Sequence, residues 1–173
     1  MEWLSVFWKR WGSRWLPVVL WMAVIFFFST RTKAEMPHCP NDLLDWPVKK
    51  IGHMIEYGIL ALLVWRATSG TLGLRARRWH IGIIAAICIS YAASDEYHQS
   101  FVAGRGSNIS DVVIDTLGMV LSLIGMSALL RFRARCPASF QRLPRLDRFL
   151  AGFLPIRPVA HDNLAERSFL MDR

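Results

Sequence analysis

Four apolar segments, each bounded by charged residues, constrain the fold of this chain more than any other feature. They run over Trp15–Ser29, Ile51–Trp65, Trp79–Ala93 and Ile109–Leu130. The chain has 173 residues, the length of one domain, and 53% of them are hydrophobic, which is rare in a soluble domain of this size. The pattern predicts an all-α membrane protein, a polytopic bundle of four transmembrane helices.

Three of these segments have about 15 residues, whereas a helix needs about 20 to cross a bilayer. Flanking Lys and Arg side chains that reach the interface, together with local bilayer thinning, offset the deficit. An alternative for the third segment is a re-entrant hairpin formed with the polar stretch after it. Basic residues precede the first segment, as in a signal peptide, but no small-x-small cleavage site follows it, so we expect an uncleaved anchor.

The distribution of Lys and Arg predicts the orientation of the bundle. Sixteen of these residues lie in the N-terminus, the second loop and the C-terminal tail, and five lie in the first and third loops. Because cytoplasmic segments carry the excess of Lys and Arg, both termini should be cytoplasmic. We therefore expect a multi-pass protein of the bacterial cytoplasmic (inner) membrane, with membrane lipids as partners.

The net charge of +8 does not indicate nucleic-acid binding, because the basic residues flank apolar segments and form no stripe with interleaved aromatic residues. The three Cys residues are too few and too scattered for a disulfide framework, and no CxxC or Cys/His metal pattern is present. We predict no nucleic-acid partner.

The polar stretch from Ser94 to Asp115, which lies between two apolar segments, contains most of the unusual charges. Charged groups are costly at membrane depth, so such a cluster is a functional-site hypothesis. In the predicted orientation it meets His53 and Glu56, which lie one turn apart on the second segment, at the outer boundary of the membrane. Glu56 and Asp115 should lie roughly 8–9 Å inside their spans. We expect the loop after the third span to carry Asp95, Glu96, His98, Gln99 and Arg105, and the fourth span to begin with Asp111 and Asp115 on one face.

Structural alternatives remain for these residues. Asp111 in the first turn of a helix favours the helix dipole and pairs naturally with Arg105. His53 is also compatible with a buried, hydrogen-bonded core histidine. The whole cluster is compatible with a polar plug that fastens helices together.

Three runs of residues combine polar and apolar positions at fixed spacing: Lys49-x-x-x-His53-x-x-Glu56-Tyr57-x-x-Leu60, Ser94-Asp95-Glu96-x-His98-Gln99-x-Phe101-x-x-Gly104-Arg105 and Ser110-Asp111-x-x-x-Asp115-x-x-Gly118. They resemble the VanZ-like family, and the resemblance covers about Leu16–Leu130. Members often carry Asn in place of Asp115 and Pro in place of Ala103. The resemblance implies a multi-spanning bacterial membrane protein and singles out His53, Asp95, Glu96, Gln99, Arg105 and Asp111. The family is named for a protein linked to low-level teicoplanin resistance, but a resistance role does not follow for this chain.

Five acids share the predicted site with one certain cation, Arg105. Some of the carboxyl groups must therefore be protonated, or a divalent cation such as Mg²⁺, Mn²⁺ or Ca²⁺ must be present. No cofactor is certain. Ser or Cys nucleophile motifs, a phosphate-binding loop and HExxH are all absent from the sequence. The five acids are Glu56, Asp95, Glu96, Asp111 and Asp115.

Three functions fit this chemistry. The first is an envelope enzyme acting on a lipid-linked or headgroup-bearing precursor, with catalytic roles for His53, Glu56, Asp95, Glu96 and Asp111. Its binding residues are Arg105, Gln99, His98 and Asp115. The second is a non-catalytic binder of an envelope ligand or glycopeptide, and the third is a structural network in an accessory membrane protein.

The composition changes after residue 130, which divides the chain into a transmembrane domain, 1–130, and a basic tail, 131–173. Within the tail, apolar residues recur at helical spacing opposite Arg residues and predict a short amphipathic helix over about 142–154 on the anionic inner leaflet. The alternative is a helix that packs against the inner loop. We expect the remainder of the tail to be disordered.

Overall fold

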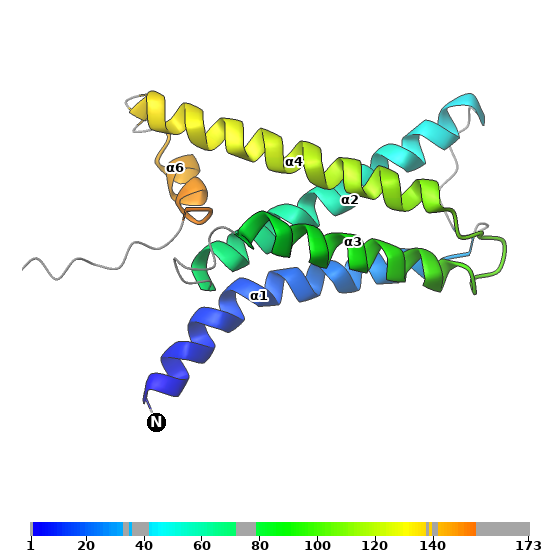
Figure 1. Cartoon of the computed structure of the whole chain (residues 1–173), viewed down its shortest axis with the longest axis horizontal. Helices are drawn as coiled ribbons and strands as arrows, with labels where there is room; N and C mark the ends of the chain where they lie inside the picture. Colours follow the sequence, from blue (N-terminus) through cyan, green and yellow to red (C-terminus); the bar gives the residue numbers. More distant parts are fainter. Residues whose placement is uncertain are drawn as a thin grey trace, which may run out of the picture.

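The computed structural model describes residues 2–32, 35, 42–71, 79–137, 139 and 142–154. Within these residues the chain forms helices and no strand, which confirms the all-α prediction (Figure 1). The disorder predicted for the end of the tail concerns residues outside the described part. The helices are α1 (Glu2–Ser29), α2 (Asp42–Thr71), α3 (His80–Gln99), α4 (Ile109–Arg135) and α6 (Pro144–Ala151).

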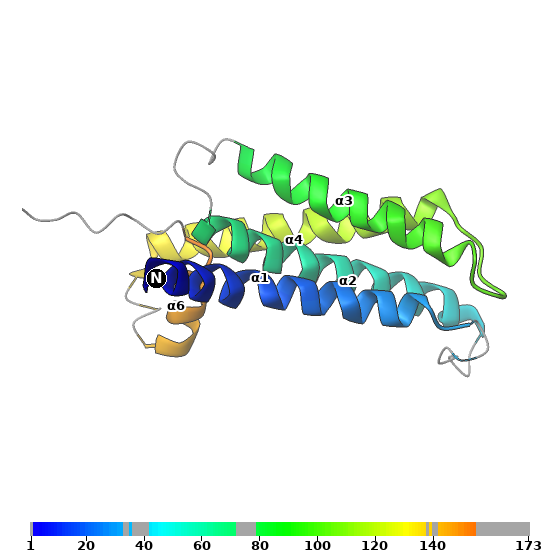
Figure 2. The same cartoon turned by 90° about the horizontal axis from the view of Figure 1, so that it is seen from below.

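The four long helices run along the length of the molecule, and α2 crosses α4 (Figures 1 and 2). The loop from α3 to α4 lies at the end of the bundle where α1 ends and α2 begins, and α6 lies at the opposite end (Figure 1). α2 packs against the other three long helices and supplies the most buried residues of the core. On α2 these include Leu60, Ala61, Val64 and Ala67, all with 0% exposure.

Within the part of the chain that the structure describes, two helices contain segments long and apolar enough to cross a membrane, Trp11–Ser29 and Ile109–Arg135. Only 17% of the first and 28% of the second is buried inside the protein, whereas the core helix of a soluble protein is mostly buried. α2 and α3 also expose large apolar residues, including Ile51, Ile55 and Ile81. An apolar surface of this extent is suited to lipid rather than to water.

α2 and α3 are longer than the apolar segments that predicted them. α2 has 30 residues and α3 has 20, which correspond to roughly 45 and 30 Å of helix. α3 continues through the polar residues that follow Ala93 and ends only at Gln99. The expectation that Asp95, Glu96, His98 and Gln99 lie in a loop was therefore wrong, because backbone hydrogen bonds continue the helix while its inner face becomes polar.

The last turn of α3 presents different residues to its two sides. Tyr97 is 70% exposed, and its ring contacts that of Phe101 at a centroid distance of 5.1 Å. Asp95 and Glu96, in contrast, are directed into the protein and are 5% and 3% exposed. This turn therefore places an aromatic pair outside and two carboxyl groups inside.

α6 packs against the end of the bundle. Leu150 is fully buried, and the Trp65 indole of α2 donates a hydrogen bond of 3.2 Å to the carbonyl of Phe153, just after α6. Arg133 of α4 pairs with Asp147 of α6 at 2.6 Å, and this guanidinium lowers the pKa of the Asp147 carboxyl below its usual value. The tail helix thus contacts both α2 and α4.

α2 and α4 touch backbone to backbone where they cross. A Cβ atom at Gly118 of α4 would lie 2.6 Å from the Cα atom of Met54 on α2 and would also clash with the Met54 carbonyl. At Gly58 a Cβ atom would meet its nearest neighbour, the Gly118 carbonyl oxygen, at 3.4 Å, close to ordinary contact distance. Only Gly118 must lack a side chain for the helices to approach this closely.

This crossing predicts opposite outcomes for two similar substitutions. Gly118→Ala should push α2 and α4 apart and lower the free energy of unfolding by about 1–3 kcal/mol. Gly58→Ala should be neutral or stabilise by up to about 1 kcal/mol, because Ala favours a helix. Thermal unfolding of the two purified variants checks this difference, and equal melting temperatures would show that the crossing does not depend on Gly118.

Candidate functional site

Three helices bring the predicted site residues to one end of the bundle. His53 and Glu56 lie on α2, the residues from Asp95 to Gln99 form the last turns of α3, and Asp111 and Asp115 lie in the first turns of α4. Arg105 lies in the loop between α3 and α4, at the same end (Figure 1). The polar cluster is defined as Lys50, His53, Glu56, Tyr57, Asp95, Glu96, Gln99, Arg105, Asp111 and Asp115.

Two charged contacts join α2 to α4. His53 Nδ1 lies 3.4 Å from Asp115 Oδ1, and Lys50 Nζ forms an ion pair with Asp111 Oδ1. The His53–Asp115 contact is electrostatic, because its geometry does not meet that of a hydrogen bond. The sequence analysis did not assign Lys50 to the site, although a cation three residues before His53 on the same helix is a usable signal.

Asp115 is the most deeply buried acid of the cluster. It is 1% exposed, and neither carboxylate oxygen has a hydrogen-bond partner within the described part of the chain. Its electrostatic neighbours are His53, Asp95 and Asp111. A buried carboxylate without a hydrogen-bond donor is costly, so this position needs an explanation beyond packing.

Each of the two carboxylates on α3 uses one oxygen for a contact within the protein. Asp95 Oδ2 accepts a hydrogen bond of 2.9 Å from the Gln99 amide, and Glu96 Oε2 accepts one of 2.9 Å from the backbone N–H of Asn108. Asn108 caps α4, since its side chain accepts from the Ser110 N–H at 3.1 Å. Asp95 Oδ1 and Glu96 Oε1 are buried and have no partner among the described residues.

His98 and Arg105 contact the end of α1 instead of the acids. His98 Nδ1 lies 3.4 Å from the Ser29 hydroxyl, and its ring lies 4.7 Å from that of Phe26. Arg105 Nη1 donates to the Ser29 carbonyl at 3.3 Å, while its charge also acts on Glu56. The structure therefore brings eight of the nine predicted residues together in the polar cluster, from α2, α3, α4 and the loop that carries Arg105, and it directs His98 toward α1.

Tyr57 belongs to the cluster, although it was not among the predicted site residues. It is 1% exposed, its hydroxyl lacks a hydrogen-bond partner in the part of the chain that is described, and the charges acting on it are those of Asp95, Asp115 and Glu56. Tyr57 follows Glu56 directly and lies four residues after His53, on the same face of α2. That spacing was a signal that the sequence contained.

No group of three or more His, Cys, Asp and Glu side chains within the described residues is arranged to hold a metal ion. The divalent cation stays a prediction. Chemically, the cluster offers carboxyl groups, a phenol and an imidazole in a partly buried setting.

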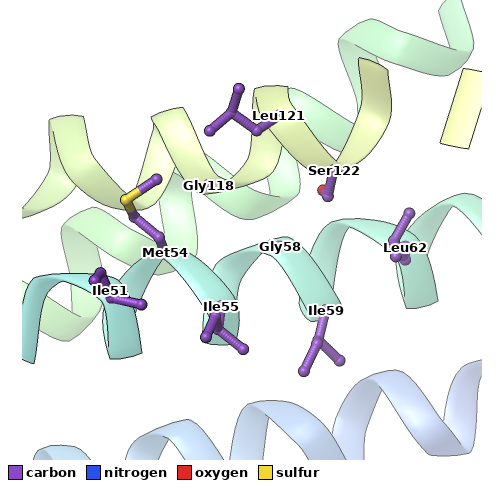
Figure 3. Close-up of a pocket in the computed structure, with 9 residues that line it drawn as sticks. All are labelled: Ile51, Met54, Ile55, Gly58, Ile59, Leu62, Gly118, Leu121 and Ser122. Carbon is purple, nitrogen blue, oxygen red and sulfur yellow. The ribbon is translucent and has the colours of Figure 1, made fainter. Parts of the chain in front are cut away.

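A separate apolar groove of about 350 Å³ lies between α2 and α4 (Figure 3). Met54, Gly58 and Gly118 contribute to its lining, so the backbone contact that sets His53 opposite Asp115 also borders this groove. The other lining residues are Ile51, Ile55, Ile59, Leu62, Leu121 and Ser122.

The Lys50–Asp111 contact yields a quantitative prediction. The two side chains are 18% and 14% exposed, so solvent screens the pair only in part. A double-mutant cycle with Lys50→Met and Asp111→Asn should give a coupling energy of about 0.5–2 kcal/mol in detergent. The Arg133–Asp147 pair, whose acid is 41% exposed, is the matched control and should couple more weakly. A coupling no larger than that of the control would remove this pair from the contacts that hold α2 to α4.

A model of the VanZ/LLP1 family matches residues 14–131. No curated protein and no solved structure matches the chain. The matched region contains α2 and α3 in full and α4 as far as residue 131, and therefore the whole polar cluster.

Proposed function

The chain belongs to the VanZ/LLP1 family, as its motifs predicted, and we propose that its polar cluster binds or processes a lipid-linked or headgroup-bearing molecule of the bacterial envelope. The family and the two apolar helices indicate a membrane protein. The proposal rests on the buried carboxyl oxygens of Asp95, Glu96 and Asp115 that have no hydrogen-bond partner among the described residues. Native structures rarely leave such groups without a partner, and a ligand supplies one.

We also propose that α1, α2, α3 and α4 all cross the bacterial inner membrane, with both termini in the cytoplasm. The lengths of α2 and α3 are sufficient for a hydrocarbon core of about 30 Å. The arrangement of the helices supports the topology, because α1 ends and α2 begins at the same end of the bundle as the loop from α3 to α4 (Figure 1). The polar cluster then lies at the outer boundary of the membrane.

This topology is tested by two reporters. Alkaline phosphatase inserted after Gly104 should be active, because it folds outside the cytoplasm, and a fluorescent protein fused after Arg173 should fluoresce, because it stays inside. Fusions with the two reporters exchanged serve as controls and should give little signal. The reverse result would invert the orientation and move the cluster to the cytoplasmic side.

In the catalytic form of the proposal, His53 or Glu56 is the general base and the Asp95–Glu96 pair is the acid or the ligand of a divalent cation. Asp111 and Asp115 set the charge around His53, and Gln99 orients Asp95. Arg105 and His98 border the site beside α1 and bind the headgroup. In the binding form, the same residues hold the molecule without reaction.

A structural role is the second candidate, and one observation favours it. The His53–Asp115 and Lys50–Asp111 contacts both join α2 to α4, as expected of residues that fasten helices. In that case a substitution at any of these four residues should lower the stability of the folded protein and should have no separate effect on ligand binding.

Lipid retention separates these functions. The full-length protein, purified from bacterial membranes in mild detergent, should retain a headgroup-bearing lipid enriched over its share of the membrane, as measured by mass spectrometry. Asp115→Asn and His53→Gln should lower that enrichment at least about fivefold, a loss of about 1 kcal/mol in binding. Asp147→Asn, on α6 at the far end of the bundle, is the control and should retain the lipid.

Folded yield and melting temperature are measured on the same samples. Enrichment that falls only in variants whose melting temperature also falls would support the structural role. A retained lipid composition equal to that of the membrane, in the wild type and in every variant, contradicts the binding and catalytic forms alike.

A further inference from the structure

The inner part of the polar cluster has more acceptor atoms than the described residues satisfy. Asp95 Oδ1, Asp115 Oδ2 and the Tyr57 hydroxyl are buried without a hydrogen-bond partner in that part of the chain. The three side chains are 5%, 1% and 1% exposed and come from α3, α4 and α2. α2, α3 and α4 pack against one another, and the charges of Asp95 and Asp115 both act on Tyr57, so the three groups belong to one neighbourhood.

The charges of the cluster do not balance. Its five acids are accompanied by Lys50, Arg105 and His53, and two of these cations are already engaged. Lys50 pairs with Asp111, and Arg105, which donates to the Ser29 carbonyl, acts on Glu56. His53 lies beside Asp115 Oδ1, which leaves Oδ2 directed elsewhere. A cation is the species that compensates buried carboxylates in a medium of low dielectric constant.

We infer that the inner part of the cluster binds a primary ammonium group. An ammonium group has three N–H donors and no acceptor, and Asp95 Oδ1, Asp115 Oδ2 and Tyr57 Oη provide three acceptors from three helices. Two of the acceptors are carboxylate oxygens, which form the strongest hydrogen bonds with such donors. The inference rests on the proposed function, since it specifies the charge of the headgroup that the cluster binds.

Ethylammonium chloride is the probe that tests the inference. The purified full-length protein is titrated at pH 7 and constant ionic strength, and its melting temperature is followed by tryptophan fluorescence. A ligand that binds only the folded state raises the melting temperature in a saturable manner. Ethylammonium should do so, whereas tetramethylammonium, which has the same charge but no N–H donor, should not.

Two variants locate the effect within the cluster. Tyr57→Phe removes only a hydroxyl and should raise the half-saturating concentration of ethylammonium about tenfold, and Asp115→Asn should abolish saturation. Asp147→Asn on α6 is the control and should behave like the wild type. If Asp115→Asn does not fold, Tyr57→Phe still decides, because its shape is unchanged.

Several outcomes overturn the inference. They are no response to ethylammonium, an equal response to tetramethylammonium, an unchanged response in both variants, and saturation by MgCl₂ or CaCl₂ at lower concentration, which would assign a divalent cation to the site. If the protein does not respond specifically to ethylammonium but does retain a lipid selectively, the proposed function stands and an ammonium ligand is excluded. A specific ethylammonium response without selective lipid retention contradicts the proposed function and leaves an amine site.

Discussion

The backbone contact between α2 and α4 at Met54 and Gly118 is the constraint on which the rest of the structure depends. It brings the two helices closer than side chains normally allow, because nothing but hydrogen separates the Gly118 Cα from its neighbour. His53 precedes Met54 by one residue, and Asp115 precedes Gly118 by three, so the same contact fixes their separation. Along the next turns it also borders the apolar groove. One glycine thus determines the geometry of both a polar and an apolar feature.

The polar cluster is held in place by groups that use only part of their hydrogen-bonding capacity. Glu96 gives one oxygen to the first turn of α4, and Asp95 gives one to Gln99. Their second oxygens and Asp115 Oδ2 have no hydrogen-bond partner within the described residues, whereas Asp115 Oδ1 lies beside His53. Proteins usually satisfy every member of a buried polar network, because each unsatisfied member costs free energy. The cluster is therefore preorganised by the helices and incomplete without a cation, a proton or water.

The helical fold and most of the cluster were predictable from the sequence, because apolar segments and charges at membrane depth are strong local signals. The end of α3 was not predictable, because a sequence that changes from apolar to polar after Ala93 has the pattern expected where a helix gives way to a loop. Tyr57 was missed because a tyrosine three residues before Leu60 on a helix is also typical of a packed core. Only the three-dimensional structure shows that its hydroxyl has no hydrogen-bond partner among the described residues. Lys50 pairs with Asp111, whereas Arg105 donates to the Ser29 carbonyl. These partners depend on which helix ends meet, and sequence spacing contains no information on that.

The exposed ring pair of Tyr97 and Phe101 has a consequence for how a ligand arrives. Aromatic side chains of this kind settle at the level of the lipid headgroups. Tyr97 lies in the last turn of α3, beside Glu96, and Phe101 follows directly after the helix, so in the proposed topology the rings set the carboxyl groups of Asp95 and Glu96 at headgroup depth as well. In the proposed function, a lipid anchored by its chains would therefore reach the acids by lateral diffusion within its own leaflet, without leaving the bilayer.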